Sequence, residues 1–181
     1  MIFNAAGLEG AWVVELERRE DERGFFARSW SPTEFAAHGL NPGLVECDVS
    51  FNHRRGTIRG LHYQVAPHEQ AKLVRCTAGA IWDCIVDLRP DSPTRTRWAA
   101  FELSAENRRA LYVPEGFAHG FQTLVDGAEV AYQMTSVHAP EAERGVRWDD
   151  PAFGIEWPEP VSLISARDGG FPDFDPRVSA G

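Results

Sequence analysis

Short apolar segments with partial alternation of apolar and polar positions recur through the middle of the chain. Residues 80–88 (AIWDCIVDL) and 128–135 (AEVAYQMT) are rich in β-branched and aromatic side chains, and residues 98–103, 110–113 and 121–125 show a similar pattern. Such segments are typical of partly buried β-strands. Turn-forming residues separate them at 89–93, 114–116 and 126–127. A turn about every ten residues is typical of a β-sandwich or barrel, so the pattern predicts an all-β fold.

One short helix is predicted near the amino end. Ser31 can cap it, Pro32 suits its first turn, and Glu34 completes a capping box with Ser31. Gly39 is placed to end the helix, and Phe35 supplies a short apolar face. We therefore expect one or two short helices beside the sheets.

The length is that of one domain. The chain has 181 residues and a mass of 20.2 kDa, within the range of about 100–200 residues of a typical domain. Neither a repeat of fixed period nor a low-complexity tract interrupts it. Residues 149–181 are rich in proline, glycine and tryptophan and lack clear periodicity. We expect them to close a single domain, residues 1–181, by packing across the barrel.

Composition and charge narrow the classes of partner. Hydrophobic residues make up 43% of the chain and charged residues 25%, as in soluble globular proteins, and no run approaches the roughly 18 apolar residues of a membrane span. The net charge of −9 gives no attraction to a phosphate backbone, although local arginines could still hold a small anion. No secretory signal is visible, and three sparse cysteines, Cys47, Cys76 and Cys84, are typical of free thiols. We predict a cytoplasmic protein without a nucleic-acid or membrane partner.

Three segments combine glycine with histidine or arginine in apolar surroundings. They are residues 59–64 with the following 70–73, residues 114–121, and residues 21–26. Glycine there indicates close approach of another backbone or of a ligand, and histidine exchanges protons near neutral pH. Taken singly, each segment is weak evidence for a site, and a lone histidine beside a glycine is more often structural than functional.

A metal site is one interpretation of these histidines. Residues 114–119 match the Pro-x-Gly-x-x-His motif of the cupin superfamily, and His62 and Glu69 fit parts of its other motif. With His119 they would provide three ligands for an open catalytic site, as in a metal-dependent cupin dioxygenase. Gln64 stands where that motif has its second histidine, and a neutral amide binds transition metals poorly. We therefore predict no functional metal and keep the dioxygenase as an alternative.

Five stretches of the chain together resemble one cupin branch. They are GTIRGLHYQ at 56–64, QAKLVRCTAGAIWDCIVDLRPDSPT at 70–94, LYVPEGFAHGFQTL at 111–124, YQMT at 132–135 and ERGVRWDDPAFGIEWP at 143–158. In content and order they are similar to the dTDP-4-dehydrorhamnose 3,5-epimerases, over about residues 21–168. The resemblance implies a double-stranded β-helix (jelly-roll) fold and a homodimeric isomerase that uses no metal or organic cofactor. It also implies a nucleoside-diphosphate 4-keto-6-deoxyhexose as substrate and a role in nucleotide-sugar and polysaccharide biosynthesis.

The resemblance further implies four catalytic residues. His62 corresponds to the base and Tyr132 to the acid that faces it. Lys72 is the lysine of the QxKLV motif, and Asp168 is the aspartate partner of the histidine.

A second set of residues is expected to bind the substrate. The resemblance implies diphosphate contacts from Arg23, Arg59 and His119, and the segment that carries Arg23 reaches the neighbouring subunit's site in the family. Further substrate contacts are expected from Phe26, Gln64 and His138, the last of which replaces a tyrosine that stacks on the nucleotide base.

The chemistry of epimerisation agrees with these roles. Removing a proton next to a ketone needs a positioned base and a group that stabilises the enolate oxygen. His62 suits the first task and Lys72 the second, while Asp168 can hold the imidazole in one tautomer. Inversion returns a proton to the opposite face, for which Tyr132 carries a hydroxyl donor.

Departures from the family pattern cluster at the nucleotide end. Arg28 stands where many members have glutamate, and residues 46–52 lack their Gln-x-Asn pair. The alternatives are a single-position epimerase acting on another nucleoside-diphosphate sugar, such as a GDP-sugar, and a sugar-binding module without activity. Because His62, Lys72 and Tyr132 are all present, epimerisation at C3, C5 or both is the preferred interpretation.

Overall fold

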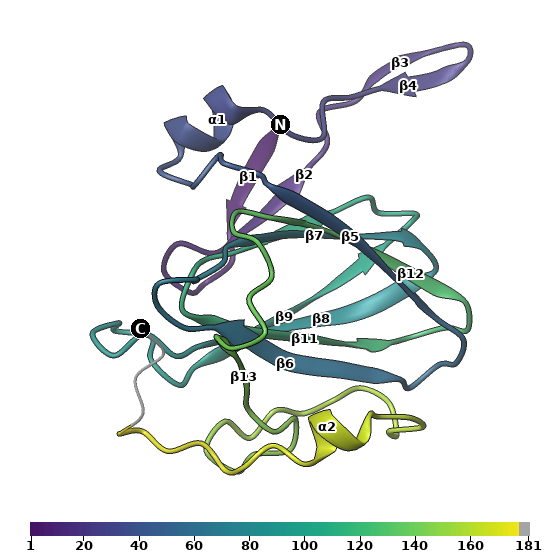
Figure 1. Ribbon diagram of the computed structural model, residues 1–181. Coiled ribbons are helices and arrows are strands. Elements are labelled where there is room, and N and C mark those ends of the chain that lie inside the picture. The colour runs from purple at the N-terminus through teal and green to yellow at the C-terminus, as the bar shows by residue number, and fades with distance from the viewer. Residues whose placement is uncertain (178–181) are drawn as a thin grey trace.

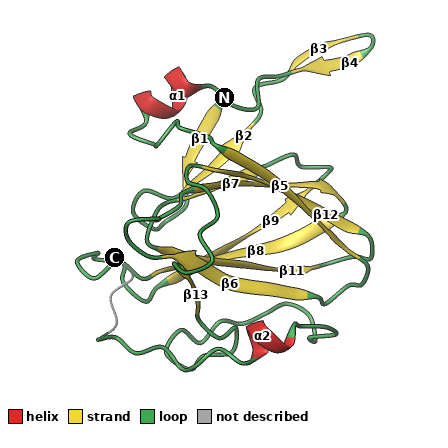
Figure 2. Ribbon diagram, viewed as in Figure 1, coloured by secondary structure: helices red, strands yellow, loops and turns green. Residues whose placement is uncertain are grey.

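Two facing antiparallel sheets dominate the computed structural model, which describes residues 1–177. Within that part of the chain there are thirteen strands and two short helices (Figures 1 and 2). The strand order passes repeatedly from one sheet to the other, as in a jelly roll. The predicted all-β jelly-roll fold with one or two short helices is therefore confirmed. Neither helix of the described residues is long and apolar enough to cross a membrane.

The larger sheet has six strands in the order β1-β2-β10-β7-β12-β5. Their bounds, in that order, are Ile2–Ala5, Trp12–Glu15, Ala110–Val113, Lys72–Ala78, Ala128–Met134 and Glu46–Asn52. All pairs within this sheet are antiparallel, and β12 lies between β7 and the edge strand β5.

The second sheet has five strands in the order β13-β6-β11-β8-β9. They are Glu143–Gly145, Ile58–Gln64, Phe117–Thr123, Ala80–Asp87 and Trp98–Ser104. A separate hairpin, β3 (Arg19–Asp21) and β4 (Gly24–Phe26), projects away from both sheets (Figure 1).

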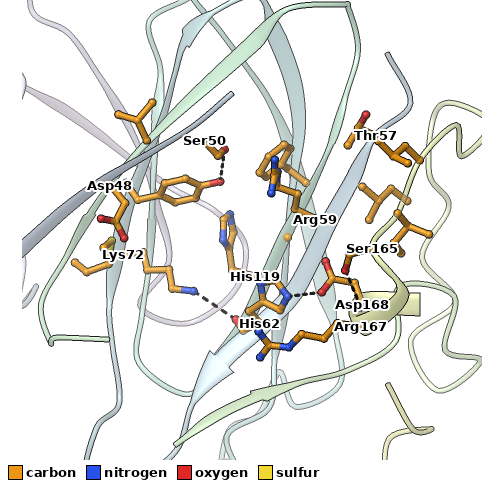
Figure 3. Close-up of a pocket in the computed structure, with 18 of the residues that line it drawn as sticks. Asp48, Ser50, Thr57, Arg59, His62, Lys72, His119, Ser165, Arg167 and Asp168 are labelled. Atoms are coloured by element: carbon orange, nitrogen blue, oxygen red, sulfur yellow. Dashed lines mark hydrogen bonds and ion pairs between the residues drawn. The ribbon is translucent and has the colours of Figure 1, made fainter. Parts of the chain in front are cut away.

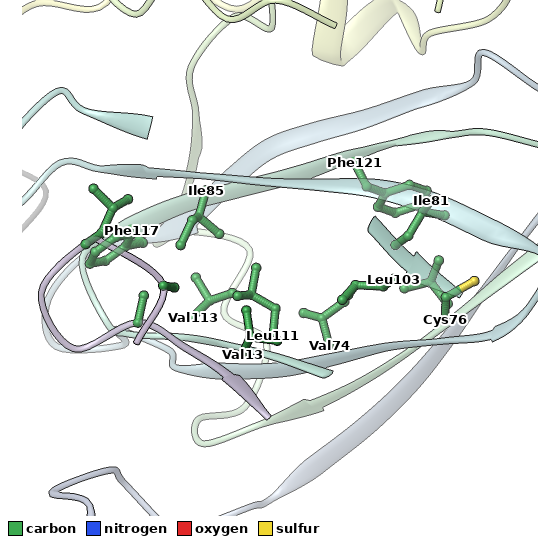
Figure 4. Close-up of a cluster of buried hydrophobic side chains, with 14 of the residues drawn as sticks. Val13, Val74, Cys76, Ile81, Ile85, Leu103, Leu111, Val113, Phe117 and Phe121 are labelled. Carbon is green, nitrogen blue, oxygen red and sulfur yellow. The ribbon is translucent and has the colours of Figure 1, made fainter. Parts of the chain in front are cut away.

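The apolar core lies between the two sheets. Val74 and Leu111 of the six-stranded sheet meet Ile85 and Phe121 of the five-stranded sheet, and each is at most 1% exposed (Figure 4). Burying a side chain of this size stabilises the fold by about 1.5–3 kcal/mol relative to leaving it in water. The core fills one end of the space between the sheets and leaves the other end open to the cavity described below.

Most predicted strands are found within two residues of their expected bounds, but one was wrong in extent. The segment expected at 121–125 belongs to β11, which begins at Phe117 and ends at Thr123. Every residue of β11 is buried, because its outer face is covered by the carboxyl-terminal segment. Burial on both faces removes the alternation of apolar and polar positions that marks a half-exposed strand.

Helix α1 (Pro32–Ala37) begins and ends as predicted, but its capping box is incomplete. The Ser31 side chain accepts a hydrogen bond from the Glu34 backbone N–H, and Gly39 adopts a φ of +71° just beyond the helix. The Glu34 carboxylate, however, pairs with the amino terminus at 2.8 Å and with Arg28 at 3.1 Å. These charged partners outcompete the backbone N–H of Ser31 because a charge-assisted hydrogen bond is stronger than a neutral one.

The carboxyl-terminal segment, described here to residue 177, runs along the outside of the five-stranded sheet (Figure 1). The Gln122 side chain bonds to the backbone of Glu159 in both directions, at 2.8 and 3.0 Å. Thr57 forms a parallel bridge with Leu163, and the short helix α2 (Ala166–Gly169) follows. This arrangement brings Asp168 of α2 beside β6, whereas residues 178–181 of the predicted closing segment lie outside the described residues.

Truncating a core side chain tests the packing. We expect Leu111→Ala to lower the free energy of unfolding by about 2–5 kcal/mol, because Leu111 is fully buried between the sheets. Val137→Ala, at a side chain that is 53% exposed, serves as the control and should change it by less than about 0.5 kcal/mol. Denaturant titration measures both, and equal effects of the two changes would contradict this view of the core.

Candidate active site

A cavity of about 720 Å³ opens between the two sheets at the end that the apolar core does not fill. Side chains from both sheets and from the carboxyl-terminal segment line it (Figure 3). The lining includes six of the predicted site residues: Arg59, His62, Lys72, His119, Tyr132 and Asp168. Residues far apart in the sequence therefore meet in one hollow that is large enough for a small molecule.

His62 and Asp168 form the best-defined pair in the cavity. His62 Nε2 lies 2.9 Å from Asp168 Oδ1, and the Gly60 N–H donates to Asp168 Oδ2 at 3.1 Å. Burial alone would raise the pKa of Asp168, but the hydrogen bonds from His62 and Gly60 outweigh it and hold that pKa below its usual value. An ionised Asp168 keeps the imidazole proton on Nε2 and leaves a lone pair on Nδ1 to accept a proton.

The backbone around His62 requires glycine at two neighbouring points. Gly60 has a φ of +117°, and a Cβ there would lie 2.5 Å from the Gly120 Cα. A Cβ on Gly120 would lie 2.6 Å from the Arg59 carbonyl oxygen. Strands β6 and β11 thus approach more closely than side chains would allow, and His119 lies directly opposite His62 in their register.

Lys72, the first residue of β7, lies beside the His62 backbone. Its Nζ is 3.5 Å from the His62 carbonyl oxygen (Figure 3). Burial lowers the pKa of Lys72 to about 8, although Glu143 and Asp83 act in the opposite direction. At neutral pH the amine is still mostly protonated, so it can present a positive charge to an oxyanion in the cavity.

Tyr132 enters the cavity from β12, in the opposite sheet from His62. Its hydroxyl lies 3.1 Å from the Ser50 Oγ, and its ring meets the His119 ring edge to face at 6.2 Å. Burial raises the pKa of Tyr132, with Ser50 as the largest opposing influence. The phenol is therefore protonated at neutral pH and able to donate.

His119 is held by a second buried carboxylate that the sequence did not single out. Its Nε2 lies 2.8 Å from Asp83 Oδ1, and both side chains are less than 5% exposed. One signal was present in the sequence. Asp83 lies two residues from each of the core residues Ile81 and Ile85, so its side chain points to the same face of β8 as theirs. A carboxylate among inward-facing apolar positions of a strand indicates a paired or functional group.

Arg59 lies at the rim of the cavity, with its guanidinium fixed by β5. Its Nε donates to Asn52 Oδ1 at 2.7 Å, and an Nη atom donates to the Phe51 carbonyl oxygen at 3.4 Å. No carboxylate pairs with Arg59 among the described ion pairs, so its charge is available for an anionic ligand.

Four predicted substrate-binding residues do not line the cavity. Arg23 and Phe26 lie on the projecting hairpin, where the Arg23 side chain is 89% exposed and pairs with Asp21. The Gln64 amide instead bonds to the backbone of residues 68, 137 and 139, and so supports the loop that carries His138. His138 itself is exposed and lies 3.8 Å from Glu143.

The donor set does not suit a metal ion. Among residues 1–177 no three histidine, cysteine, aspartate or glutamate side chains lie close enough together to hold one. His62 and His119 each direct Nε2 at an aspartate, and Glu69 is not among the cavity-lining residues. The three-ligand alternative from His62, Glu69 and His119 therefore does not match this geometry.

Comparison with known proteins identifies the family. Residues 5–175 match the family model for dTDP-4-dehydrorhamnose 3,5-epimerase. The dTDP-4-dehydrorhamnose 3,5-epimerase of Sinorhizobium fredii is 40% identical over 175 residues, which cover 96% of this chain and 90% of that protein.

Solved structures support membership of the same family. The dTDP-4-dehydrorhamnose 3,5-epimerase of Bacillus anthracis, with TDP and PPi bound, is 39% identical with a TM-score of 0.91, over 96% of this chain and 99% of its own. A double mutant of ChmJ, a 3′-monoepimerase from Streptomyces bikiniensis, in complex with dTDP, is 36% identical with a TM-score of 0.83, over 92% of this chain and 84% of its own. Since these similarities extend over nearly the whole sequence and fold, the chain belongs to the dTDP-4-dehydrorhamnose 3,5-epimerase family.

Proposed function

We propose that this protein is an isomerase that inverts C3 and C5 of dTDP-4-dehydro-6-deoxyglucose to give dTDP-4-dehydrorhamnose. The observation that carries the proposal is the placement of His62 and Tyr132 on opposite sheets around one cavity. A base and an acid so placed can act on the two faces of a sugar ring between them. The family membership supports the choice of substrate.

The first step is removal of a proton next to the C4 ketone. His62 Nδ1 accepts the proton, the C–H electron pair forms a double bond to C4, the carbonyl π pair moves to oxygen, and an enolate results. Asp168 stabilises the imidazolium that results, since it holds Nε2 at 2.9 Å. Lys72 places its ammonium group where the enolate oxygen develops, a contribution that is commonly worth about 10²–10³ in rate.

The second step returns a proton from the other side. Tyr132 donates its hydroxyl proton to the same carbon as the carbonyl re-forms, which inverts the configuration. Because C3 and C5 both adjoin the C4 ketone, the same pair of residues serves both carbons when the ring shifts in the cavity. In the ChmJ variant crystallised with dTDP, a histidine and a tyrosine separated by as many residues as His62 and Tyr132 were replaced together, which supports these roles.

The nucleotide end of the substrate is expected to use Arg59 and His119 of this chain together with the hairpin of a second copy. Arg23 and Phe26 cannot serve the cavity of their own chain from the projecting hairpin. The exposed aromatic rings of Phe25 and Phe26 support contact with another chain. We therefore include a homodimer in the proposal.

A cytoplasmic location is also part of this proposal. Cys47, Cys76 and Cys84 are free thiols, which is typical of a reducing compartment.

Proton exchange tests the reaction and its two stereocentres. Incubated in D₂O with dTDP-4-dehydro-6-deoxyglucose, the wild-type protein should introduce deuterium at both C3 and C5, as read by NMR. His62→Ala should lose exchange at both carbons and slow turnover by about 10²–10⁴. Tyr132→Phe should retain exchange into the substrate but form product far more slowly. Deuterium at only one carbon would show a single-position epimerase, and full turnover by His62→Ala would refute the mechanism.

The charge of Lys72 predicts an alkaline limit to activity. Because burial lowers the pKa of Lys72 to about 8, the ammonium loses its proton as the pH rises through that value, and kcat/KM should fall there. Lys72→Met should lower kcat/KM by about 10²–10³ at neutral pH and abolish this alkaline fall. A wild-type profile that stays level to pH 10 would contradict the role of the ammonium.

Complementation tests the contribution of the second copy. Arg23→Ala should raise the KM for the nucleotide sugar, and His62→Ala should be inactive. A mixed dimer of the two variants contains one complete site, so at substrate concentrations well below the KM of Arg23→Ala co-expression should restore about a quarter of wild-type activity if subunits pair at random. Mixed dimers no more active than the Arg23→Ala homodimer would contradict the shared site, and sedimentation analysis would confirm that the dimers form.

A further inference from the structure

We infer that Ser50 is a positioning residue for the Tyr132 hydroxyl and stabilises the phenolate that Tyr132 becomes when it protonates the sugar. The inference deepens the proposed function and rests on it. It assigns to the edge strand β5 a part in the proton-return step, whereas all four expected catalytic residues lie on β6, β7, β12 and α2.

The contact is specific to these two side chains. Ser50 Oγ lies 3.1 Å from the Tyr132 Oη, and both residues line the cavity (Figure 3). This is the one side-chain hydrogen bond of either hydroxyl within the described residues. Strand β5 pairs with β12 so that Val130 is opposite Ser50 and Asp48 is opposite Tyr132, which places the serine diagonally beside the phenol.

The charges around the Tyr132 phenol oxygen explain why the Ser50 hydroxyl would be important for a phenolate. Asp83 of β8 and Asp48 of β5 disfavour a negative charge on Tyr132, while Arg59 of β6 favours it. The His119 ring, held by Asp83, meets the Tyr132 ring by its edge. Ser50 is the neutral donor in direct contact, so it is the group able to turn its O–H toward a developing phenolate without adding charge.

The proton balance is closed. Tyr132 O–H gives its proton to the enolate carbon, the enolate electrons form the new C–H bond, and the carbonyl double bond re-forms. The phenolate that remains accepts a hydrogen bond from Ser50 O–H, and the proton held by His62 passes to solvent while solvent reprotonates Tyr132. No oxidant, reductant or further reactant is required.

This role predicts a change in how the enolate partitions. When Tyr132 donates slowly, the protonated His62 exchanges its proton with D₂O and returns deuterium to the face from which the proton was taken. We expect Ser50→Ala to slow product formation by about 10- to 100-fold, the usual effect of losing a hydrogen bond to a charged group. Deuterium exchange into the unreacted substrate should change by less than about threefold, so the ratio of exchange to inversion should rise.

Matched variants separate the hydroxyl from packing. Ser50→Thr keeps the hydroxyl and should restore a nearly wild-type ratio. Cys47→Ala, at an exposed position of the same strand that does not line the cavity, should leave both rates unchanged. If Ser50→Ala melts below the assay temperature, Ser50→Cys keeps the size of the side chain with a weaker donor and should give the same direction of change.

Each outcome has a distinct meaning. A wild-type ratio in Ser50→Ala, or equal loss in Ser50→Ala and Ser50→Thr, would overturn the role of Ser50 while leaving the epimerase activity in place. Equal loss of exchange and inversion in Ser50→Ala would likewise overturn it. That result would indicate general damage to the site, which slows proton transfer at both faces of the sugar alike. If the wild-type protein neither exchanges nor converts the substrate, the proposed function itself falls.

Discussion

The hydrogen bonds of the Asp168 carboxylate join the carboxyl-terminal segment to strand β6 and to the imidazole of His62. Asp168 is 5% exposed, and a carboxylate so deeply buried is tolerated only when donors satisfy it. The donors are the His62 ring and the Gly60 N–H, while the Ser165 Oγ accepts the Asp168 backbone N–H at 3.0 Å. The contact that fixes α2 against β6 is therefore the contact that fixes the imidazole tautomer. Stability of the closing segment and readiness of the base depend on one set of bonds.

Burial influences the pKa of three ionisable groups in the same cavity, and the hydrogen-bond or charge partners of each group determine the direction of its net shift. Asp168 receives hydrogen bonds, so its pKa stays low in spite of burial. Lys72 forms no ion pair within the described residues, so burial brings its pKa down toward 8. Tyr132 has the neutral Ser50 as its hydrogen-bond partner, so burial raises its pKa. One cavity thus holds an ionised carboxylate, a cation close to losing its proton and a protonated phenol, a set that suits the proposed proton transfer through an enolate.

Local patterns predicted the strands that are rich in β-branched and aromatic residues and lie between clear turn-forming residues. Strands β8, β9, β10 and β12 carry enough alternation and turn punctuation to be recognised, and Ser31 and Gly39 mark the ends of α1. The bounds of β11 were wrong because a strand covered on both faces has no period to detect. The family resemblance supplied the six predicted residues that line the cavity.

What the sequence could not supply were partners fixed by the register between neighbouring strands of one sheet. Ser50 meets Tyr132 only because β5 and β12 adopt one register, and Asp83 meets His119 only because β8 and β11 do. The ion pair between the Glu34 carboxylate and the amino terminus was likewise not predictable from a local motif, because it joins residues distant in sequence. Long-range register of this kind depends on the whole hydrophobic pattern and is not encoded in a short motif.

The two-sheet architecture itself supplies what inversion needs. An epimerase must reach both faces of one carbon, and the side chains that one sheet turns toward a cavity approach a ligand there from one side. Here β6 carries the proposed base, His62, from the five-stranded sheet, while β7 and β12 carry Lys72 and the proposed acid, Tyr132, from the six-stranded sheet. The cavity of about 720 Å³ lies in the gap between these facing sheets. The apolar core packs between the same two sheets, so residues such as Leu111 and Ile85 help to hold the separation between the proposed base and the proposed acid.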